Sequence, residues 1–283
     1  MKRILPLLLA LCFLLCGCGS RSTAEAPLSI PAPPLTVPVP EDAPDVDRSA
    51  EYIYLAHPEL TGVDYDSPAL LPLSEDMGQA YLDRMVFLCD SPTYWLWPYG
   101  LLSGGTNTTQ VWTGPEGTMT LAYLRGFEIR DPYDFSEATI AEVAARHRPE
   151  YIIIALGING IAFMDETYFK QEYAHLIDEI QRASPDTTLI LQSMYPICRS
   201  FRYWGDITNA SITEGNRWIL ELAEEYRLRY LDVFSALLGE DGNARPELMQ
   251  NDGLHPNYDG LARVLEYIRT HGYLPYPENG GRG

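Results

Sequence analysis

Short, continuously apolar segments are the feature that most constrains the fold of this chain. The strongest, residues 151–156, contains three consecutive isoleucines, and residues 85–90 form a similar run. Weaker or shorter runs occur at residues 118–124, 187–192 and 230–233. Continuous apolar segments of this length are typical of strands in a parallel sheet that is covered on both faces. We therefore expect these five segments to form a central sheet.

The segments between the predicted strands have the periodicity of amphipathic helices. Apolar residues recur at helical spacing in residues 136–148, in residues 167–182 and again from residue 257 onward. Ser211 and Glu214 have the spacing of a capping box, which predicts the start of another helix. Strands and helices that alternate in this way predict the α/β class, as three α/β/α layers around a central, mostly parallel five-stranded sheet.

Residues with catalytic side chains follow the predicted strands. Ser91 follows the first strand, Asn159 follows the third, and Asp252 and His255 lie between the fifth strand and the last helix. Sites in open parallel sheets form beyond the carboxyl ends of the strands, so we expect all four residues to meet at one edge. A serine nucleophile, a histidine base, a carboxylate that orients the base and an amide oxyanion donor are the parts of a serine esterase.

Each of these residues also fits a plainer role when it is taken alone. Ser91 suits a helix cap, Asn159 suits a turn, and Asp252 with His255 suits half of a metal site. The order of the whole set favours catalysis over these alternatives. No further cluster of His, Cys or carboxylate residues supports a metal in the sequence, so we expect neither a metal nor a cofactor.

Three sequence blocks resemble those of the SGNH/GDSL hydrolase family. Residues 87–93 resemble its Gly-Asp-Ser block, with Cys89 in place of glycine. Residues 156–160 resemble its Gly-x-Asn-Asp block, with Gly160 in the last position. Residues 252–256 match its Asp-x-x-His block. The resemblance extends over roughly residues 85 to 273 and is greatest to a bacterial lipoprotein branch of the family.

The resemblance implies a flavodoxin-like SGNH hydrolase fold and a role for each matching residue. Ser91 would be the nucleophile, His255 the base and Asp252 the group that orients the base. The Ser91 N–H and the Asn159 side-chain amide would form the oxyanion hole together with a glycine N–H. Which glycine supplies this N–H depends on where the second strand lies. A strand at residues 118–124 points to Gly126, whereas a strand at residues 109–112 points to Gly105.

We favour Gly105 because residues 103–107 have the composition of a tight turn that offers backbone N–H groups.

The N-terminus has the pattern of a bacterial lipoprotein signal. Lys2 and Arg3 precede an apolar run at residues 4–15, which is too short to span a membrane. The run ends in Leu-Cys-Gly-Cys, which resembles a lipoprotein cleavage box. We expect residues 1–17 to be a signal peptide and Cys18 to carry the lipid. An ordinary secreted protein is the alternative.

The next segment, residues 18–50, is expected to be a lipid-anchored spacer. It contains seven prolines and few large apolar residues, so it cannot bury enough surface to offset its ordering entropy. Residues 51–283 are expected to form one hydrolase domain, with its core at about residues 85–273. The protein would then be extracytoplasmic and anchored to the bacterial cell membrane through its N-terminal lipid.

The net charge and the cysteine content exclude a nucleic-acid-binding protein and a domain built on a disulfide framework. The formal charge is −19, from 20 Lys and Arg against 39 Asp and Glu, which excludes a nucleic-acid partner. The expected domain contains only Cys89 and Cys198. Two cysteines do not make a disulfide framework, and we favour two buried thiols over the alternative, a single disulfide formed in an oxidising compartment.

Two aromatic groups lie where a substrate could contact them, although core packing explains them equally well. The first group follows the nucleophile closely: Tyr94, Trp95, Trp97, Tyr99 and Trp112. The second follows the fourth strand, together with two arginines: Arg199, Phe201, Arg202, Tyr203 and Trp204. The predicted function is a cell-surface serine esterase that cleaves O-acyl esters, O-acetyl esters included, with carbohydrate esters among the candidate substrates. A non-catalytic binding lipoprotein and an O-acyltransferase are the alternatives.

Overall fold

A computed structural model of the chain describes residues 60–202 and 207–278. The predicted signal peptide at residues 1–17, the predicted lipidation site at Cys18 and the predicted spacer at residues 18–50 lie outside these ranges. In the part of the chain that the structure describes, no helix combines the length and the apolar character needed to cross a membrane.

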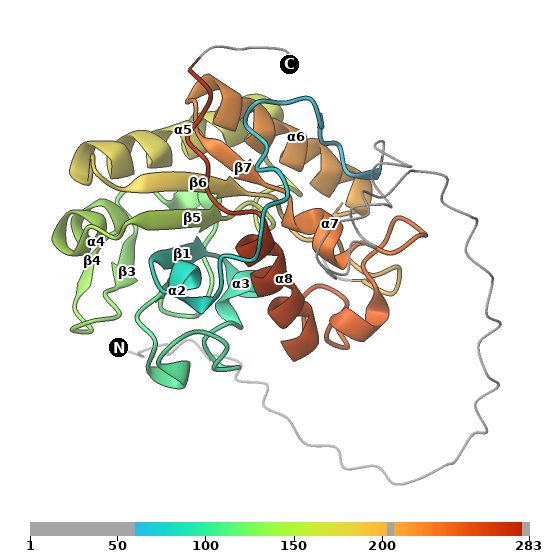
Figure 1. The fold of residues 1–283 in the computed structure, drawn as a ribbon, viewed down its shortest axis with the longest axis horizontal. Coiled ribbons are helices and arrows are strands. Elements are labelled where there is room, and N and C mark those ends of the chain that lie inside the picture. The colour runs from blue at the N-terminus through green and yellow to red at the C-terminus, as the bar shows by residue number, and fades with distance from the viewer. Residues whose placement is uncertain (1–59, 203–206, 279–283) are drawn as a thin grey trace, which may run out of the picture. The chain divides into compact units, whose positions relative to one another are not determined.

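A five-stranded sheet forms the centre of the fold, with strand order β2-β1-β5-β6-β7 (Figure 1). All four pairs of neighbouring strands are parallel, which confirms the predicted α/β class. The strands are β1 (Met85–Cys89), β2 (Val111–Trp112), β5 (Tyr151–Ala155), β6 (Thr188–Gln192) and β7 (Arg229–Leu231).

Helices cover both faces of the sheet, and a small antiparallel hairpin is separate from it (Figure 1). The longer helices are α4 (Ile140–His147), α5 (Glu166–Ala183), α6 (Asn209–Glu225) and α8 (Tyr258–Thr270). The shorter ones are α2 (Gln79–Leu82), α3 (Ser91–Tyr94) and α7 (Val233–Leu237), with 3₁₀ turns η2 (Gly105–Asn107), η3 (Leu121–Tyr123) and η4 (Pro246–Leu248). The hairpin consists of β3 (Glu128–Arg130) and β4 (Glu137–Thr139).

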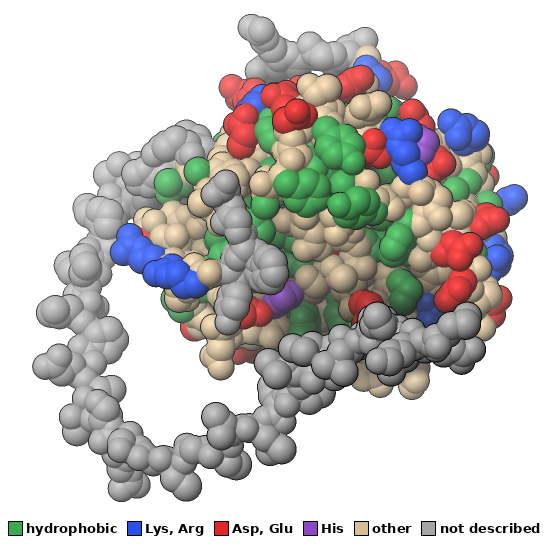
Figure 2. Space-filling model, turned by 180° about the vertical axis from the view of Figure 1, so that it is seen from behind, with side chains coloured by type: hydrophobic (Ala, Val, Ile, Leu, Met, Phe, Trp, Pro, Cys, Tyr) green, Lys and Arg blue, Asp and Glu red, His purple; other side chains and the backbone are tan. Residues whose placement is uncertain are grey.

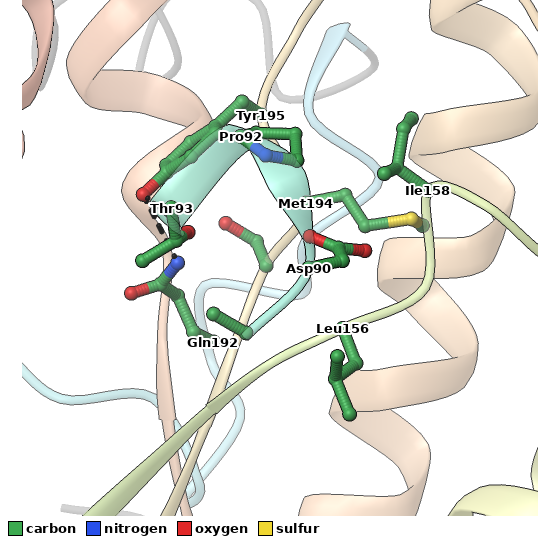
Figure 3. Close-up of a pocket in the computed structure, with 10 residues that line it drawn as sticks. Asp90, Pro92, Thr93, Leu156, Ile158, Gln192, Met194 and Tyr195 are labelled. Carbon is green, nitrogen blue, oxygen red and sulfur yellow. Dashed lines mark hydrogen bonds between the residues drawn. The ribbon is translucent and has the colours of Figure 1, made fainter. Parts of the chain in front are cut away.

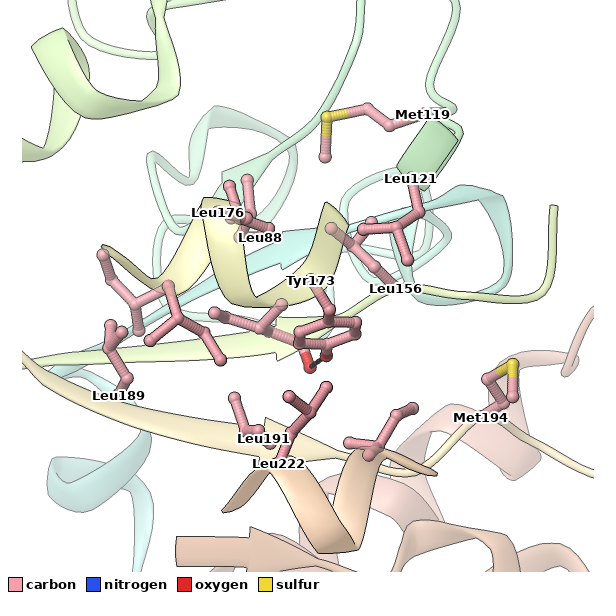
Figure 4. Close-up of a cluster of buried hydrophobic side chains, with 14 of the residues drawn as sticks. Leu88, Met119, Leu121, Leu156, Tyr173, Leu176, Leu189, Leu191, Met194 and Leu222 are labelled. Carbon is pink, nitrogen blue, oxygen red and sulfur yellow. Dashed lines mark hydrogen bonds between the residues drawn. The ribbon is translucent and has the colours of Figure 1, made fainter. Parts of the chain in front are cut away.

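Two hydrophobic clusters fill the spaces between these layers, because successive side chains of a strand point to opposite faces. Val86 and Leu88 of β1 pack with α4, α5 and α6, whereas Met85 and Phe87 pack with α2, α7 and α8. Tyr173 of α5 lies in the first cluster, surrounded by leucines (Figure 4), and its hydroxyl donates to the carbonyl oxygen of Ile154 at 3.2 Å. The sheet is thus buried on both faces, as its apolar strands predict.

One predicted strand is wrong. Residues 118–124 contain η3, and Met119 and Leu121 project into the first cluster (Figure 4). The edge position of the sheet belongs to β2, which pairs with only two residues of β1. Gln110 holds the start of β2 in place, because its side-chain amide donates to the carbonyl oxygens of Leu82 and Met85 at 2.7 and 2.8 Å.

Two helices begin at other residues than their sequence patterns predict. Thr139 caps α4 in a reciprocal box with Glu142, so residues 137–139 belong to β4 instead of the helix. Thr208 caps α6 together with Ser211, and the predicted Ser211–Glu214 box does not form. A capping box depends on where the chain enters the helix, and that entry is set by packing outside the helix.

Cys89 and Cys198 are buried free thiols, as expected.

Candidate active site

Ser91 opens α3 immediately after β1, so the sheet itself holds its backbone. Asp90 precedes the helix as the N-cap residue, and Pro92 lies in the first turn, where its missing N–H costs nothing. The Ser91 Oγ lies 3.0 Å from the Nε2 of His255. A hydroxyl at this distance can pass its proton to an unprotonated imidazole nitrogen.

Asp252 holds His255 from the loop before α8. One carboxylate oxygen, Oδ1, accepts the backbone N–H groups of Leu254 and His255 at 2.9 and 3.0 Å. The other, Oδ2, lies 2.6 Å from the His255 Nδ1. Burial raises the pKa of Asp252, but these hydrogen bonds outweigh burial and leave the pKa lowered. A carboxylate at Nδ1 favours the tautomer that leaves Nε2 free to accept the proton of Ser91.

The loop that carries Asn159 is joined to the nucleophile turn through Asp90. The Asp90 Oδ2 accepts the backbone N–H of Gly157 at 3.2 Å. Figure 3 shows the Asp90 side chain beside the segment that carries Leu156 and Ile158, next to a cavity of about 10 Å³. Burial raises the pKa of Asp90 to about 7, because its effect is larger than that of the hydrogen bonds from the Gly157 and Ile158 N–H groups, which lower the pKa.

The side-chain amide of Asn159 points to the segment after β2. Its Nδ2 donates to the Thr118 Oγ1 at 2.9 Å and to the Met119 carbonyl oxygen at 2.8 Å. Both amide hydrogens are therefore engaged inside the protein. An amide hydrogen of Asn159 can bond to an oxyanion only if its present hydrogen bond breaks. The bond to the rotatable hydroxyl of Thr118 breaks more easily than the bond to the Met119 carbonyl oxygen.

The structure argues against Gly105 as the glycine donor. Gly105 precedes β2, and the nearby Ser103 donates to Asp83, which lies before the start of β1. Gly105 is therefore at the opposite end of the strands from Ser91. Sites in open parallel sheets form beyond the carboxyl ends of the strands, whereas Gly105 lies before the start of β2.

Gly114 is the glycine that follows β2. The register pairs Leu88 with Trp112, which brings Gly114 level with Asp90. A Cβ on Gly114 would lie 2.3 Å from the Thr118 carbonyl oxygen, so only glycine permits this close turn. Gly126, the other candidate from the sequence, follows η3 instead of a strand of the sheet.

The sequence did not predict a role at this site for three of its residues. The role of Asp90 could not be predicted, because its sequence neighbours, an apolar strand and a serine, do not show whether its carboxylate is buried or exposed. Gly114 could have been found, because it is the first glycine after the possible strand at residues 109–112. Thr118 lies in the segment that was expected to be a strand and carried no signal of its own.

The aromatic residues near the nucleophile divide between core and surface. Trp112 is fully buried, whereas 42% of Trp97 is exposed. Tyr203 and Trp204 lie outside the described residues. Hydrophobic side chains also reach the surface in a group on the face that Figure 2 shows.

The chain is similar to known hydrolases over most of its described length. Residues 102–263, more than half of the chain, match the model of the GDSL-like lipase/acylhydrolase family. The matched range contains Asn159, Asp252 and His255 and begins after Ser91. None of the curated proteins matches the chain.

Solved structures that resemble the chain come from several organisms. They include a GDSL-like lipase from Bacteroides thetaiotaomicron (16% identity, covering 77% of this chain and 94% of that one, TM-score 0.44). A protein from Desulfitobacterium hafniense, described as lipolytic and of the G-D-S-L family, has 21% identity over 65% of this chain and 97% of its own, with a TM-score of 0.45. A carbohydrate esterase of family 3 from Talaromyces cellulolyticus has 17% identity over 65% of this chain and 93% of its own, with a TM-score of 0.41. Likeness at these identities says nothing about substrate.

Proposed function

Because the chain belongs to the GDSL-like lipase/acylhydrolase family and is an ester-hydrolysing enzyme of the SGNH type, we propose that Ser91 is its nucleophile, with His255 as the base and Asp252 as the group that orients the base. One observation carries the proposal: the Ser91 Oγ, both ring nitrogens of His255 and the Asp252 carboxylate form a continuous chain, with distances of 3.0 and 2.6 Å. This arrangement meets the need of a serine hydroxyl for an adjacent base.

The reaction follows in two halves. The His255 Nε2 takes the proton of Ser91 while the Oγ forms a bond to the ester carbonyl carbon, whose oxygen becomes an oxyanion. The oxyanion then reforms the carbonyl, the ester C–O bond breaks, and the departing alcohol takes the proton from His255. Water attacks the resulting acyl-enzyme in the same way, which releases the carboxylic acid and returns the proton to Ser91.

The oxyanion would be held by the backbone N–H groups of Ser91 and Gly114 and by the side-chain amide of Asn159. The position of Gly114 after β2, next to the nucleophile turn, supports its inclusion. Asn159 contributes once its hydrogen bond to Thr118 is exchanged for one to the oxyanion. Such donors are most effective when they are already in place before the charge develops.

An active-site probe tests the nucleophile. A fluorophosphonate should label wild-type protein at Ser91, as determined by peptide mapping, and Ser91→Ala should abolish both labelling and ester hydrolysis while leaving the melting temperature unchanged. Ser103→Ala is the matched control, because Ser103 hydrogen-bonds Asp83 at the other end of β1. The Ser103→Ala protein should still be labelled at Ser91 and should keep full activity. Labelling of another serine in the wild type rules Ser91 out.

The proposed setting is the outer side of a bacterial membrane, with the lipid on Cys18. The support lies in the sequence: Lys2 and Arg3, the apolar run at residues 4–15 and the Leu-Cys-Gly-Cys that ends it. In cells, wild-type protein should fractionate with membranes, and Cys18→Ala should be released or remain unprocessed. Cys16→Ala, two residues away, is the control. Identical fractionation together with identical processing, as shown by the same mass of Cys18→Ala and wild type after allowance for the lipid, would exclude a lipid anchor at this position.

A further inference from the structure

A larger cavity lies beside the nucleophile turn. Its volume is about 510 Å³, within the usual range for small-ligand pockets. Tyr94, on the same short helix as Ser91, and Gly114, a candidate oxyanion donor, are among its lining residues. The loop between β3 and β4 forms another wall through Tyr133 and Phe135. We call this cavity the hairpin pocket.

The lining of the hairpin pocket differs from the surface of the protein as a whole. The chain has 39 acidic residues against 20 basic ones, yet Arg130 is the only charged residue among the described residues that line the pocket. Besides Val111, prolines and glycines, the lining contains aromatic rings and polar side chains, the latter including the Thr106 hydroxyl and the Asn107 amide. Sugar rings present both kinds of surface, because their C–H faces stack on aromatic rings and their hydroxyls exchange hydrogen bonds with polar side chains.

Phe135 is an unusual residue on the pocket wall. It is 65% exposed, and its backbone φ of +63° lies in the left-handed region, which is costly for a bulky side chain. The guanidinium of Arg130 lies 4.8 Å from the centre of its ring. Packing in the core does not account for a strained, exposed phenylalanine, whereas a contact with a ligand does.

The wall that carries Phe135 is firmly held. Asp131 is fully buried and accepts hydrogen bonds from Arg146 at 2.6 Å and from the His147 Nε2 at 2.7 Å. The Tyr133 ring stacks on His147 with centroids 3.9 Å apart. The pocket is therefore formed before any ligand enters, which lowers the entropy cost of binding.

Trp97 is fixed on the other side of the pocket. Its Nε1 donates to the Thr106 carbonyl oxygen at 2.6 Å, while 42% of the residue stays exposed. The indole is thus oriented by its polar edge and by the Tyr94 ring, whose centroid lies 5.7 Å away in an edge-to-face contact, and part of its apolar surface remains available for a ligand.

We propose that the hairpin pocket binds a sugar ring of an acylated saccharide while the ester of that saccharide reaches Ser91. This proposal rests on the proposed function, because it places the ester at the same site. It names the substrate class as carbohydrate esters and assigns Phe135 and Trp97 as the residues that select them.

Substrate comparison tests this assignment. We would measure kcat/KM for p-nitrophenyl acetate and for a panel of O-acetylated oligosaccharides derived from xylan, glucan and uronan. Phe135→Gly should lower the ratio of saccharide to p-nitrophenyl acetate kcat/KM about tenfold, through KM, and Trp97→Ala should do the same. Glycine suits the backbone of residue 135, so the melting temperature of Phe135→Gly should not fall.

Two controls separate ligand contact from general damage. Phe135→Tyr keeps an aromatic ring, so its ratio of saccharide to p-nitrophenyl acetate kcat/KM should equal that of the wild type. Tyr123→Ala removes an aromatic residue that is 70% exposed but does not line the pocket, and it should leave the ratio at the wild-type value.

The outcomes of this experiment are distinct. Hydrolysis of p-nitrophenyl acetate without hydrolysis of any saccharide, or an unchanged ratio in both pocket variants, overturns the sugar subsite and leaves the esterase proposal standing. Absence of hydrolysis of every ester, together with absence of fluorophosphonate labelling, is instead a failure of the proposed function.

Discussion

The carboxylate of Asp90 accepts the backbone N–H of Gly157 at 3.2 Å and thereby ties the nucleophile turn to the loop of Asn159. The family pattern places a carboxylate after the asparagine, where this chain has Gly160. A Cβ on Gly160 would lie 2.6 Å from the Met164 Sδ, so a larger side chain does not fit there without movement of Met164. The brace on the asparagine loop therefore comes from the residue before the nucleophile.

The buried Asp90 predicts a dependence of stability on pH. Burial raises its pKa to about 7 in the folded protein, above about 3.9 in the unfolded chain. Between these values the folded state keeps a proton that the unfolded state has lost, so the free energy of unfolding falls as pH rises. The slope from this group is up to about 1.4 kcal/mol per pH unit.

Urea unfolding across this pH range measures the slope. Asp90→Asn cannot titrate and should lose stability less steeply between about pH 4 and pH 7. Burial also raises the pKa of Asp232, to about 6, so part of the slope should persist in the variant. Equal slopes in Asp90→Asn and wild type would contradict the raised pKa of Asp90.

The His255 and Asp252 variants should differ in severity. His255→Ala should lower kcat as far as Ser91→Ala, by about 10⁶-fold, because base and nucleophile act as a unit. Asp252→Asn should cost about 10⁴-fold, since the imidazole remains but its tautomer is no longer favoured. The double variant of Ser91 and His255 should be no worse than either single one. Steady-state kinetics on p-nitrophenyl acetate gives these values, and small losses in both single variants would exclude this catalytic unit.

Asn159 offers a test of the oxyanion hole. Asn159→Ala should lower kcat by roughly 10²- to 10³-fold and change KM little, because its amide would meet a charge that exists only in the transition state. Thr118→Val removes a competing acceptor at 2.9 Å and should keep kcat at or above the wild-type value. A rise in KM alone for Asn159→Ala would assign this residue to ground-state binding.

Gly114 and Gly105 form a matched pair of alanine substitutions. Gly114→Ala brings a Cβ to 2.3 Å from the Thr118 carbonyl oxygen and should displace the turn, which lowers kcat by about 10²-fold. Gly105→Ala meets no neighbouring atom but has a φ of +57°, so it should cost about 1 kcal/mol of stability and leave kcat unchanged. Steady-state kinetics and urea unfolding of both variants measure these effects. A loss of kcat in Gly105→Ala with an unchanged kcat in Gly114→Ala would instead assign Gly105 as the donor.

Much of the site could be predicted because its signals are local. The apolar run of residues 151–156 predicts a buried strand wherever it lies in the fold, and Ser91 and Asn159 directly follow such runs. Parallel strands bring their carboxyl ends to one edge, so the convergence of Ser91 with Asp252 and His255 also follows from the strand order. The structure does place the side chains of these three residues in contact.

Local sequence patterns were therefore sufficient to predict the fold class and the residues that follow the strands. The identity of the edge strand depends on tertiary contacts, because the two residues of β2 are held by the Gln110 side chain and not by a pattern of their own. Tertiary contacts also make Asp90 the brace of the asparagine loop and bring Phe135 of the hairpin to the pocket that Tyr94 and Gly114 line. These features depend on contacts between residues far apart in the chain, and such contacts leave no local periodicity to read.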